Sequence, residues 1–245
     1  FPSARTLYSR LKSPYVDVVN VQGVSAAVYA TIYTDVSYQV TFDNSNSRAD
    51  ERDVYQTVQD LHTFFETFAP GFGFTNQQVS AQVNINSTCN AYYLGNAIHF
   101  YNAGNGCANT GQMMDVVAHE YGHGVQEAIL GWQGDQGLGE GNGDVTGFLM
   151  TMSSVIGRGI YNCSSGFRDA SNALKYPDDV IGQEIHDAGR VIAGFHWDAM
   201  QDQIVRYGDW GRYSAAWDWH WGRVLQLPTT QPAQRAPDAR AEPLA

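Results

Sequence analysis

Residues 115–124 read Asp-Val-Val-Ala-His-Glu-Tyr-Gly-His-Gly, and the rest of the chain is organised around this stretch. His119 and His123 are four residues apart, so on a helix both side chains lie on one face, one turn apart. Both imidazole rings can therefore reach one metal ion, with Glu120 beside them. In this H-E-x-x-H pattern the histidines bind zinc and the glutamate acts as general base. The alternative is two histidines on an ordinary amphipathic helix.

A catalytic zinc ion needs a third protein ligand, which must come from another element. Residues 139–144 read Gly-Glu-Gly-Asn-Gly-Asp and open a second helical pattern, in which Glu140 and Asp144 share one face. We expect one carboxylate to bind the metal and the other to hold a ligand histidine by its second ring nitrogen. The alternative is an acidic pair that only stabilises a helix N-terminus.

Composition limits the class of protein. The chain has 245 residues, enough for one large domain or two lobes that share a core. Its hydrophobic content of 43% excludes a largely disordered chain, and its net charge of −11 argues against nucleic-acid binding. The sequence has no apolar run long enough to span a membrane, so no membrane partner is expected.

Three cysteines are present: Cys89, Cys107 and Cys163. The first two flank a segment with hairpin character and are expected to form a disulfide. Cys163 would then be unpaired, or paired with something outside this chain. The alternative is three buried thiols.

Hydrophobic periodicity predicts strands in the first half of the chain and helices in the second. Strands are expected at 16–21, 24–33 and 36–42 in a twisted antiparallel sheet, and again at 79–85, 91–94 and 97–101, with a tight turn at Gly95-Asn96. Helices are expected at 50–68, 112–130, 140–156, 184–207 and, from a tryptophan-rich pattern, 208–225. Residues 157–183 are expected to be irregular.

These patterns predict an α+β fold with three parts. Residues 1–130 form a β-rich N-terminal lobe that ends in the metal-binding helix, and residues 131–225 form a helical C-terminal lobe. Residues 226–245 are rich in Pro, Gln, Ala and Arg without periodicity, and we expect a disordered tail.

The run from Cys89 to Asp144 resembles the thermolysin-like zinc peptidases (the gluzincin group), and most closely the fungalysin family. The resemblance covers roughly residues 35–205 and is strongest over the two metal-binding helices. It implies a thermolysin-like fold. It rests on the segments 49–55, Asn90-Ala91-Tyr92-Tyr93, 115–124, 139–144, Phe167-Arg168-Asp169-Ala170 and 185–190.

The resemblance implies a role for each matching residue. Glu140 would be the third zinc ligand beside His119 and His123, Asp144 the carboxylate that holds His119, and Glu120 the general base. On the substrate side, His186 would stabilise the oxyanion, Arg168 would bind the substrate carbonyl, and Asn90 and Ala91 would lie on the edge strand that holds the peptide. From the residues alone, His186 reads equally as a functionless histidine at a helix start, and Arg168 as a surface cation.

The sequence differs from the family in three places. The connector between His123 and Glu140 is short, and only Trp132 stands where the family has a transition-state tyrosine. Asp115 matches a calcium ligand of thermolysin, but the partner carboxylate falls on Thr151, so a structural calcium is doubtful. The C-terminal lobe is short, which suggests a truncated or cleaved chain.

The expected function is a secreted zinc-dependent endopeptidase with one catalytic zinc ion, acting on protein or peptide substrates. The family implies a zymogen with an N-terminal prodomain, and residues 1 to about 35 could be the end of such a segment. Two alternatives remain. A zinc aminopeptidase would need an acidic group for the substrate's free amine, and no such motif is evident. A non-catalytic binding module would keep the metal-binding helix without the activity.

Overall fold

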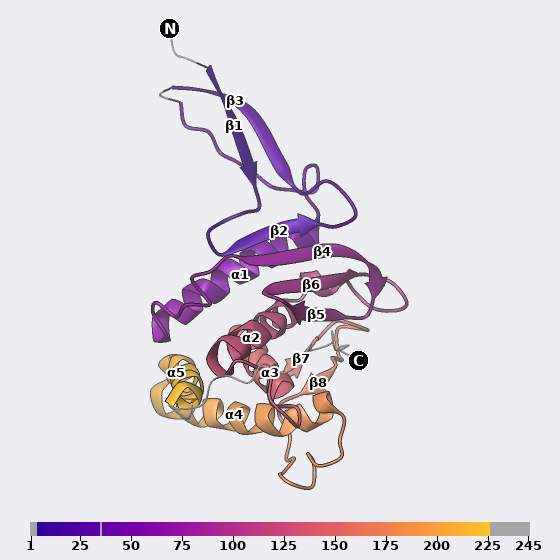
Figure 1. Ribbon diagram of the computed structural model, residues 1–245, viewed down its shortest axis with the longest axis vertical. Coiled ribbons are helices and arrows are strands. Elements are labelled where there is room, and N and C mark those ends of the chain that lie inside the picture. Colours follow the sequence, from indigo (N-terminus) through magenta and orange to yellow (C-terminus); the bar gives the residue numbers. More distant parts are fainter. Residues whose placement is uncertain (1–3, 35, 226–245) are drawn as a thin grey trace.

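A computed structural model describes residues 4–34 and 36–225. The fold is α+β, with most strands before the central helix α2 (Met114–Leu130) and most helices after it (Figure 1). Within the described residues no helix is both long and apolar enough to cross a membrane. The disordered tail expected at 226–245 lies outside the described residues.

A four-stranded mixed sheet forms the β-rich part of the body. Its strand order is β2 (Val16–Asn20), β4 (Val79–Thr88), β6 (Ala97–Asn102) and β5 (Ala91–Leu94). β2 and β6 run parallel to β4, whereas β5 pairs antiparallel with β6. The turn predicted between β5 and β6 is confirmed, since Gly95 and Asn96 both have positive φ, as a tight hairpin turn requires. β5 is therefore an edge strand.

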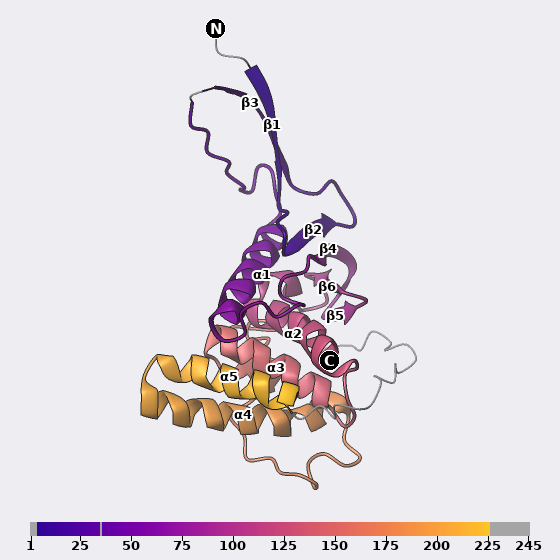
Figure 2. The same cartoon turned by 60° about the vertical axis from the view of Figure 1, so that its left-hand side comes forward.

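The N-terminal strands do not form the single antiparallel sheet that the sequence predicted. β1 (Ala4–Arg10) and β3 (Ala27–Tyr33) pair antiparallel in a ribbon that projects from the body (Figures 1 and 2). β2 leaves this ribbon and joins the main sheet in parallel, burying Val16 and Val18. The prediction failed because alternation indicates which side chains are buried, and not which strand is the partner.

The prediction of a strand at 36–42 was also wrong. This segment has no regular secondary structure, and Val36 and Tyr38 are exposed. Its alternating pattern favours an extended chain, but no strand pairs with it in the described part of the chain. Without a partner strand, β-propensity does not produce a strand.

The helices follow the predicted periodicity closely. α1 (Ala49–Phe68) packs against β2 and β4, and α2, after the short 3-10 turn η1 (Thr110–Gln112), packs against β5 and β6. α3 (Leu138–Thr151), α4 (Ile185–Tyr207) and α5 (Trp210–Leu225) complete the helical half. α3 ends earlier than predicted because Met152 is left-handed, and β7 (Val155–Ile156) then pairs with β8 (Arg168–Asp169).

One hydrophobic core joins the two halves. Phe65 of α1 lies near Tyr121 of α2 and Trp219 of α5, with ring centroids 6.2 and 6.4 Å away. The indole of Trp221 donates a hydrogen bond to the carbonyl of Phe68, and that of Trp219 donates to Asn142 on α3. α5 is thereby tied to both α1 and α3, and the core holds α2 between the sheet and the later helices.

Candidate active site

α2 and α3 approach each other closely enough for their side chains to share one site. A Cβ at Gly122 would lie 2.5 Å from Thr146 Oγ1 and 3.1 Å from the Cα of Gly143. A Cβ at Gly143 would lie 2.7 Å from the ring of His119. The glycines that weaken each helix locally therefore let α3 lie directly over His119.

Three residues bring potential ligand atoms together between these helices, and we call His119, His123 and Glu140 the ligand group. His119 Nε2 lies 3.1 Å from His123 Nε2 and 3.2 Å from Glu140 Oε2, and His123 Nε2 lies 3.5 Å from Glu140 Oε1. Ligands about 2.0–2.1 Å from a tetrahedral zinc ion lie roughly 3.3–3.4 Å apart. Two ring nitrogens and a carboxylate are donors that zinc prefers, and their separations of 3.1–3.5 Å are close to those expected around a zinc ion. The ligand group is the one set of three or more His, Cys, Asp or Glu donors found within residues 4–34 and 36–225.

Asp144 holds the first histidine in place. Its Oδ1 lies 2.8 Å from His119 Nδ1, which leaves Nε2 directed toward the ligand group. Burial raises the pKa of Asp144, but the charge and hydrogen bonds of Arg168, together with His119, outweigh burial and lower this pKa to about 2. Asp144 is therefore a carboxylate. Neither carboxylate caps α3 by a hydrogen bond, since the N-cap is Gly137 and no side chain caps it, although Glu140 lies in the first turn.

Arg168 is buried rather than a surface cation. Its Nε and Nη2 donate to the two oxygens of Asp144 at 2.8 and 2.7 Å, a bidentate contact. The small β7–β8 pair places Arg168 there, because Ile156 of β7 pairs with it. Arg168 thus reaches His119 through Asp144.

Gln133, in the connector between α2 and α3, holds the second histidine. Its Oε1 lies 3.0 Å from His123 Nδ1, and its Nε2 donates to the carbonyl of His123 at 3.0 Å. Each histidine of the ligand group therefore has an oxygen acceptor on the nitrogen that faces away from the other ligands.

Glu120 is buried beside the ligand group, and its Oε1 has no hydrogen-bond partner among the described residues. Burial raises its pKa to about 8, with His119 lowering and Glu140 raising it. A buried carboxylate of this kind is a strong proton acceptor when ionised, and a nearby cation favours the ionised form. The unpaired oxygen is an independent indication that the site binds further groups.

His186 reaches the same site from the first turn of α4. Its Nε2 lies 3.4 Å from Glu140 Oε2, and its Nδ1 lies 2.6 Å from Glu184 Oε1. The side chain of Glu184 also caps α4 by accepting the backbone N–H of His186 at 2.8 Å. His186 therefore lies against the ligand group.

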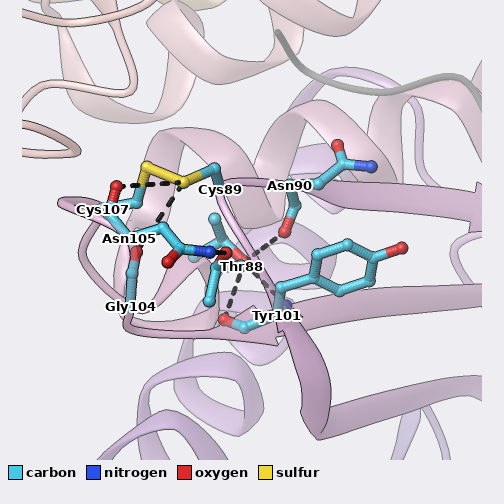
Figure 3. The surroundings of a disulfide bond; sticks show 8 residues. Thr88, Cys89, Asn90, Tyr101, Gly104, Asn105 and Cys107 are labelled. Atoms are coloured by element: carbon cyan, nitrogen blue, oxygen red, sulfur yellow. Dashed lines mark hydrogen bonds between the residues drawn. A yellow bond between two sulfur atoms is a disulfide. The ribbon is translucent and has the colours of Figure 1, made fainter.

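The predicted peptide-binding residues lie where β5 begins, Asn90 directly before the strand (Figure 3) and Ala91 at its first position. Ala91 is buried, and the carbonyl of Asn90 accepts hydrogen bonds from Tyr101 N at 3.3 Å and Thr110 Oγ1 at 2.8 Å. The predicted disulfide between Cys89 and Cys107 is confirmed and ties this strand start to the following loop. The alternative of three buried thiols was wrong, since Cys163 is an exposed free thiol.

Asp115, the residue that matches a calcium ligand, has another role here. Its carboxylate accepts the backbone N–H of Val116 at 2.9 Å and of Gly157 at 2.7 Å. Thr151, at the position of the partner carboxylate, donates its hydroxyl to the carbonyl of Gly147. Asp115 thus connects the start of α2 to the turn that follows β7.

Comparison with solved structures supports the fold. The structure is similar to that of the precursor of protealysin, a metalloproteinase from Serratia proteamaculans, with a TM-score of 0.65 and 17% identity. The similarity covers 89% of this chain and 75% of that chain. The chain therefore has the thermolysin-like α+β fold expected from the sequence. No family model and no curated protein matches the sequence.

Sequence reasoning missed two residues of the site, Gln133 and Glu184. Glu184 had a recognisable signal, because it stands two residues before His186 at a helix start, where an acidic side chain can accept backbone N–H groups. Gln133 had none, since its contact with His123 depends on the path of the connector.

Proposed function

We propose that this protein is a zinc-dependent endopeptidase that binds the ion through His119, His123 and Glu140. The observation that carries the proposal is the convergence of these three residues, whose donor atoms lie 3.1–3.5 Å apart, beside a buried carboxylate oxygen of Glu120 that has no hydrogen-bond partner among the described residues. Similarity to a metalloproteinase precursor supports it. The closer likeness to fungalysins remains a proposal from the sequence motifs.

Bound zinc would supply Lewis-acid polarisation of a water molecule and of the scissile carbonyl. Glu120 takes the proton of the attacking water and passes it to the leaving amine. His186, whose Nδ1 donates to Glu184, acts as an imidazolium, with a second ring proton on Nε2, and donates from Nε2 to the oxyanion that develops on the substrate. The resemblance implies that Arg168 binds the substrate carbonyl and helps to stabilise the oxyanion, although its Nε and Nη2 donate to Asp144 in this structure.

The substrate lies extended along β5. An edge strand has free backbone groups along one side, so a peptide can add to it as a further strand. Asn90 and Ala91 stand at the start of this strand, on the part held by the disulfide. A preference for an apolar side chain after the cleaved bond rests on the family resemblance.

We also propose that the protein is secreted and made as a precursor with an N-terminal prosegment. The Cys89–Cys107 disulfide supports an oxidising compartment. The similar solved structure is itself that of a precursor. Detection of the protein in the culture medium of the source cells, with an N-terminus generated by cleavage, is the expected result, and a strictly cell-retained protein contradicts it.

The test compares wild type with Glu120→Gln and with the control Glu127→Gln, an exposed glutamate further along α2. All three should bind one zinc ion per chain. Casein hydrolysis should fall about 10²–10⁴-fold in Glu120→Gln because the general base is lost, and should not change in the control. Wild type that binds zinc but cleaves nothing contradicts the enzyme proposal, and an active Glu120→Gln contradicts the role of Glu120.

Endopeptidase and aminopeptidase activities are separated by blocking the peptide ends. An endopeptidase cleaves an N-acetylated, C-amidated peptide at internal bonds as well as it cleaves the free peptide. If only the free peptide is cleaved, one residue at a time from its N-terminus, the endopeptidase assignment is wrong.

A further inference from the structure

The connector between α2 and α3 brings one side chain against the second histidine at two points. Gln133 Oε1 lies 3.0 Å from His123 Nδ1, and Gln133 Nε2 donates to the carbonyl of the same histidine at 3.0 Å. The amide therefore contacts both the ring and the backbone of His123. A contact at two points restricts both the rotation of the ring and the position of the amide.

These two contacts determine which way the amide points. With its oxygen and nitrogen exchanged, Gln133 would place an acceptor against the backbone carbonyl, which is itself an acceptor. The observed orientation leaves an acceptor at Nδ1, so Nδ1 carries the ring proton of neutral His123. The lone pair is then on Nε2, the nitrogen that lies 3.5 Å from Glu140 Oε1.

Gln133 is held in this position by its neighbours. A Cβ at Gly139 would lie 2.9 Å from the carbonyl oxygen and 3.0 Å from the side chain of Gln133, so α3 begins directly against it. Gln126 Nε2 donates to that carbonyl oxygen at 3.3 Å, and Arg223 Nη1 donates to Gln126 Oε1 at 2.7 Å. The guanidinium of Arg223 lies 3.9 Å from the ring centroid of Trp219, so this chain of contacts ends on α5.

The two histidines are held by acceptors of different charge. His119 faces the carboxylate of Asp144, whose charge is balanced by Arg168. His123 faces a neutral amide, in a site that already contains Glu120 and Glu140. A neutral acceptor fixes the tautomer without adding another negative charge.

We propose that Gln133 is a positioning residue for metal binding, which presents Nε2 of His123 to the ion as Asp144 presents that of His119. The inference rests on the proposed zinc site. The groups that determine metal affinity would then include Gln133 in the connector. Through Gln126 and Arg223 they would also be linked to α5.

The experiment measures zinc affinity by competition with a chromophoric chelator for wild type and three variants. Gln133→Met keeps the side-chain length but removes both polar contacts, whereas Gln133→Glu keeps an acceptor for His123 Nδ1. Gln136→Met is the matched control, an exposed glutamine of the same connector. Cobalt(II) replaces zinc in a parallel set, so that the visible absorption spectrum reports ligand geometry.

We expect Gln133→Met to bind zinc about 10–100-fold more weakly than wild type and to change the cobalt spectrum. Gln133→Glu should stay within roughly tenfold of wild type, below the loss expected when an outer hydrogen-bond partner is removed. Gln136→Met should match wild type. The thermal unfolding of each metal-free protein shows that the variants fold.

Wild-type affinity and spectrum in Gln133→Met would overturn the inference while leaving the zinc site intact. Equal loss of affinity in Gln133→Glu and Gln133→Met would also overturn it, because an acceptor at His123 Nδ1 would then not be what sustains metal binding. If Gln133→Met does not fold, Gln133→Glu decides by retaining or losing affinity. Wild type that binds no zinc would instead contradict the proposed function, and this inference with it.

Discussion

Asp144 contacts both a metal-ligand candidate, His119, and the buried cation Arg168. Its Oδ1 lies within hydrogen-bond distance of both His119 Nδ1 and Arg168 Nη2, its Oδ2 accepts from Arg168 Nε, and both partners are buried. Arg168 has a raised pKa because the charge and hydrogen bonds of Asp144 outweigh its burial. The ion pair therefore depends on Asp144 being charged, and the orientation of a metal ligand depends on the ion pair.

Replacement of Asp144 by Asn should damage metal binding and stability together. We expect zinc affinity to fall about 10–100-fold because the ring of His119 loses its charged acceptor. The free energy of unfolding should fall by about 3–5 kcal/mol, because Arg168 remains buried without a counter-charge. Chelator competition and urea unfolding measure the two effects. Asp198→Asn, at an exposed site on α4, should change neither.

His220 should make the folded protein sensitive to mild acid. It is fully buried near the rings of Phe65, Phe68 and Phe72, and neither ring nitrogen has a hydrogen-bond partner among the described residues. Burial, with a smaller contribution from Arg223, lowers its pKa to about 4. In the unfolded chain a histidine has a pKa of about 6.5, so between these values the unfolded state binds more protons.

Stability should therefore be fully present above pH 6.5 and fall as the pH is lowered toward 4. Urea unfolding at several pH values measures this slope for wild type and for His220→Phe, which keeps an aromatic ring but cannot bind the proton. The variant should lose less stability over this range. Identical slopes for the two proteins would contradict a neutral, buried His220.

At the scale of elements, the contact between α2 and α3 is set by small residues. Gly143 lies so close to His119 that a methyl group would overlap the imidazole ring. The same contact brings Glu140 to Nε2 and Asp144 to Nδ1 of His119. A change in the distance between the helices should therefore affect the ligand group before it affects the rest of the fold.

Replacement of Gly143 by Ala tests this contact. We expect a loss of about 1–3 kcal/mol of stability from overpacking, together with weaker zinc binding as His119 is displaced. Gly222→Ala in α5 is the control, since nothing lies within 4 Å of its added Cβ and a helical alanine should stabilise by about 0.5–1 kcal/mol. Unchanged zinc affinity in Gly143→Ala would contradict the importance of the close contact.

At the scale of the whole molecule, the β1–β3 ribbon buries less of its side-chain surface than the body does. It contains two strands with mostly exposed or half-buried side chains and projects from the sheet (Figures 1 and 2). A two-stranded ribbon with little buried surface is only marginally stable. The main sheet, in contrast, is covered by α1 and α2.

Hydrogen exchange should therefore show two levels of stability. We expect the amides of Ala4–Arg10 and Ala27–Tyr33 to exchange through local opening, long before those of β6 and α2, which should exchange only on global unfolding. Mass spectrometry of peptic peptides measures both in one experiment. Equal protection of the ribbon and of β6 would indicate that the ribbon is part of the cooperative core.

The elements that were predicted correctly share one property, since their signals are local. The periodicity of α1 to α5 and the turn at Gly95-Asn96 depend on residues within a few positions of one another. Whether β2 pairs parallel or antiparallel, and whether residues 36–42 form a strand at all, depends on strands distant in the sequence. The predictions for these two segments were wrong. Alternating hydrophobicity describes both a paired strand and an exposed extended segment.

The site residues also divide into those predicted from local spacing and those placed by contacts between distant segments. The spacing of His119, Glu120 and His123 was sufficient to predict a metal-binding helix, and that of Glu140 and Asp144 a shared face, because helical geometry relates residues four apart. Helical spacing carries no information about which faces of separate elements meet. The packing of α2, α3 and α4 decided the rest of the site: the burial of Arg168 against Asp144, the contacts of Gln133 and Glu184, and the distances among the donor atoms. Each of these contacts joins residues that only the tertiary structure brings together.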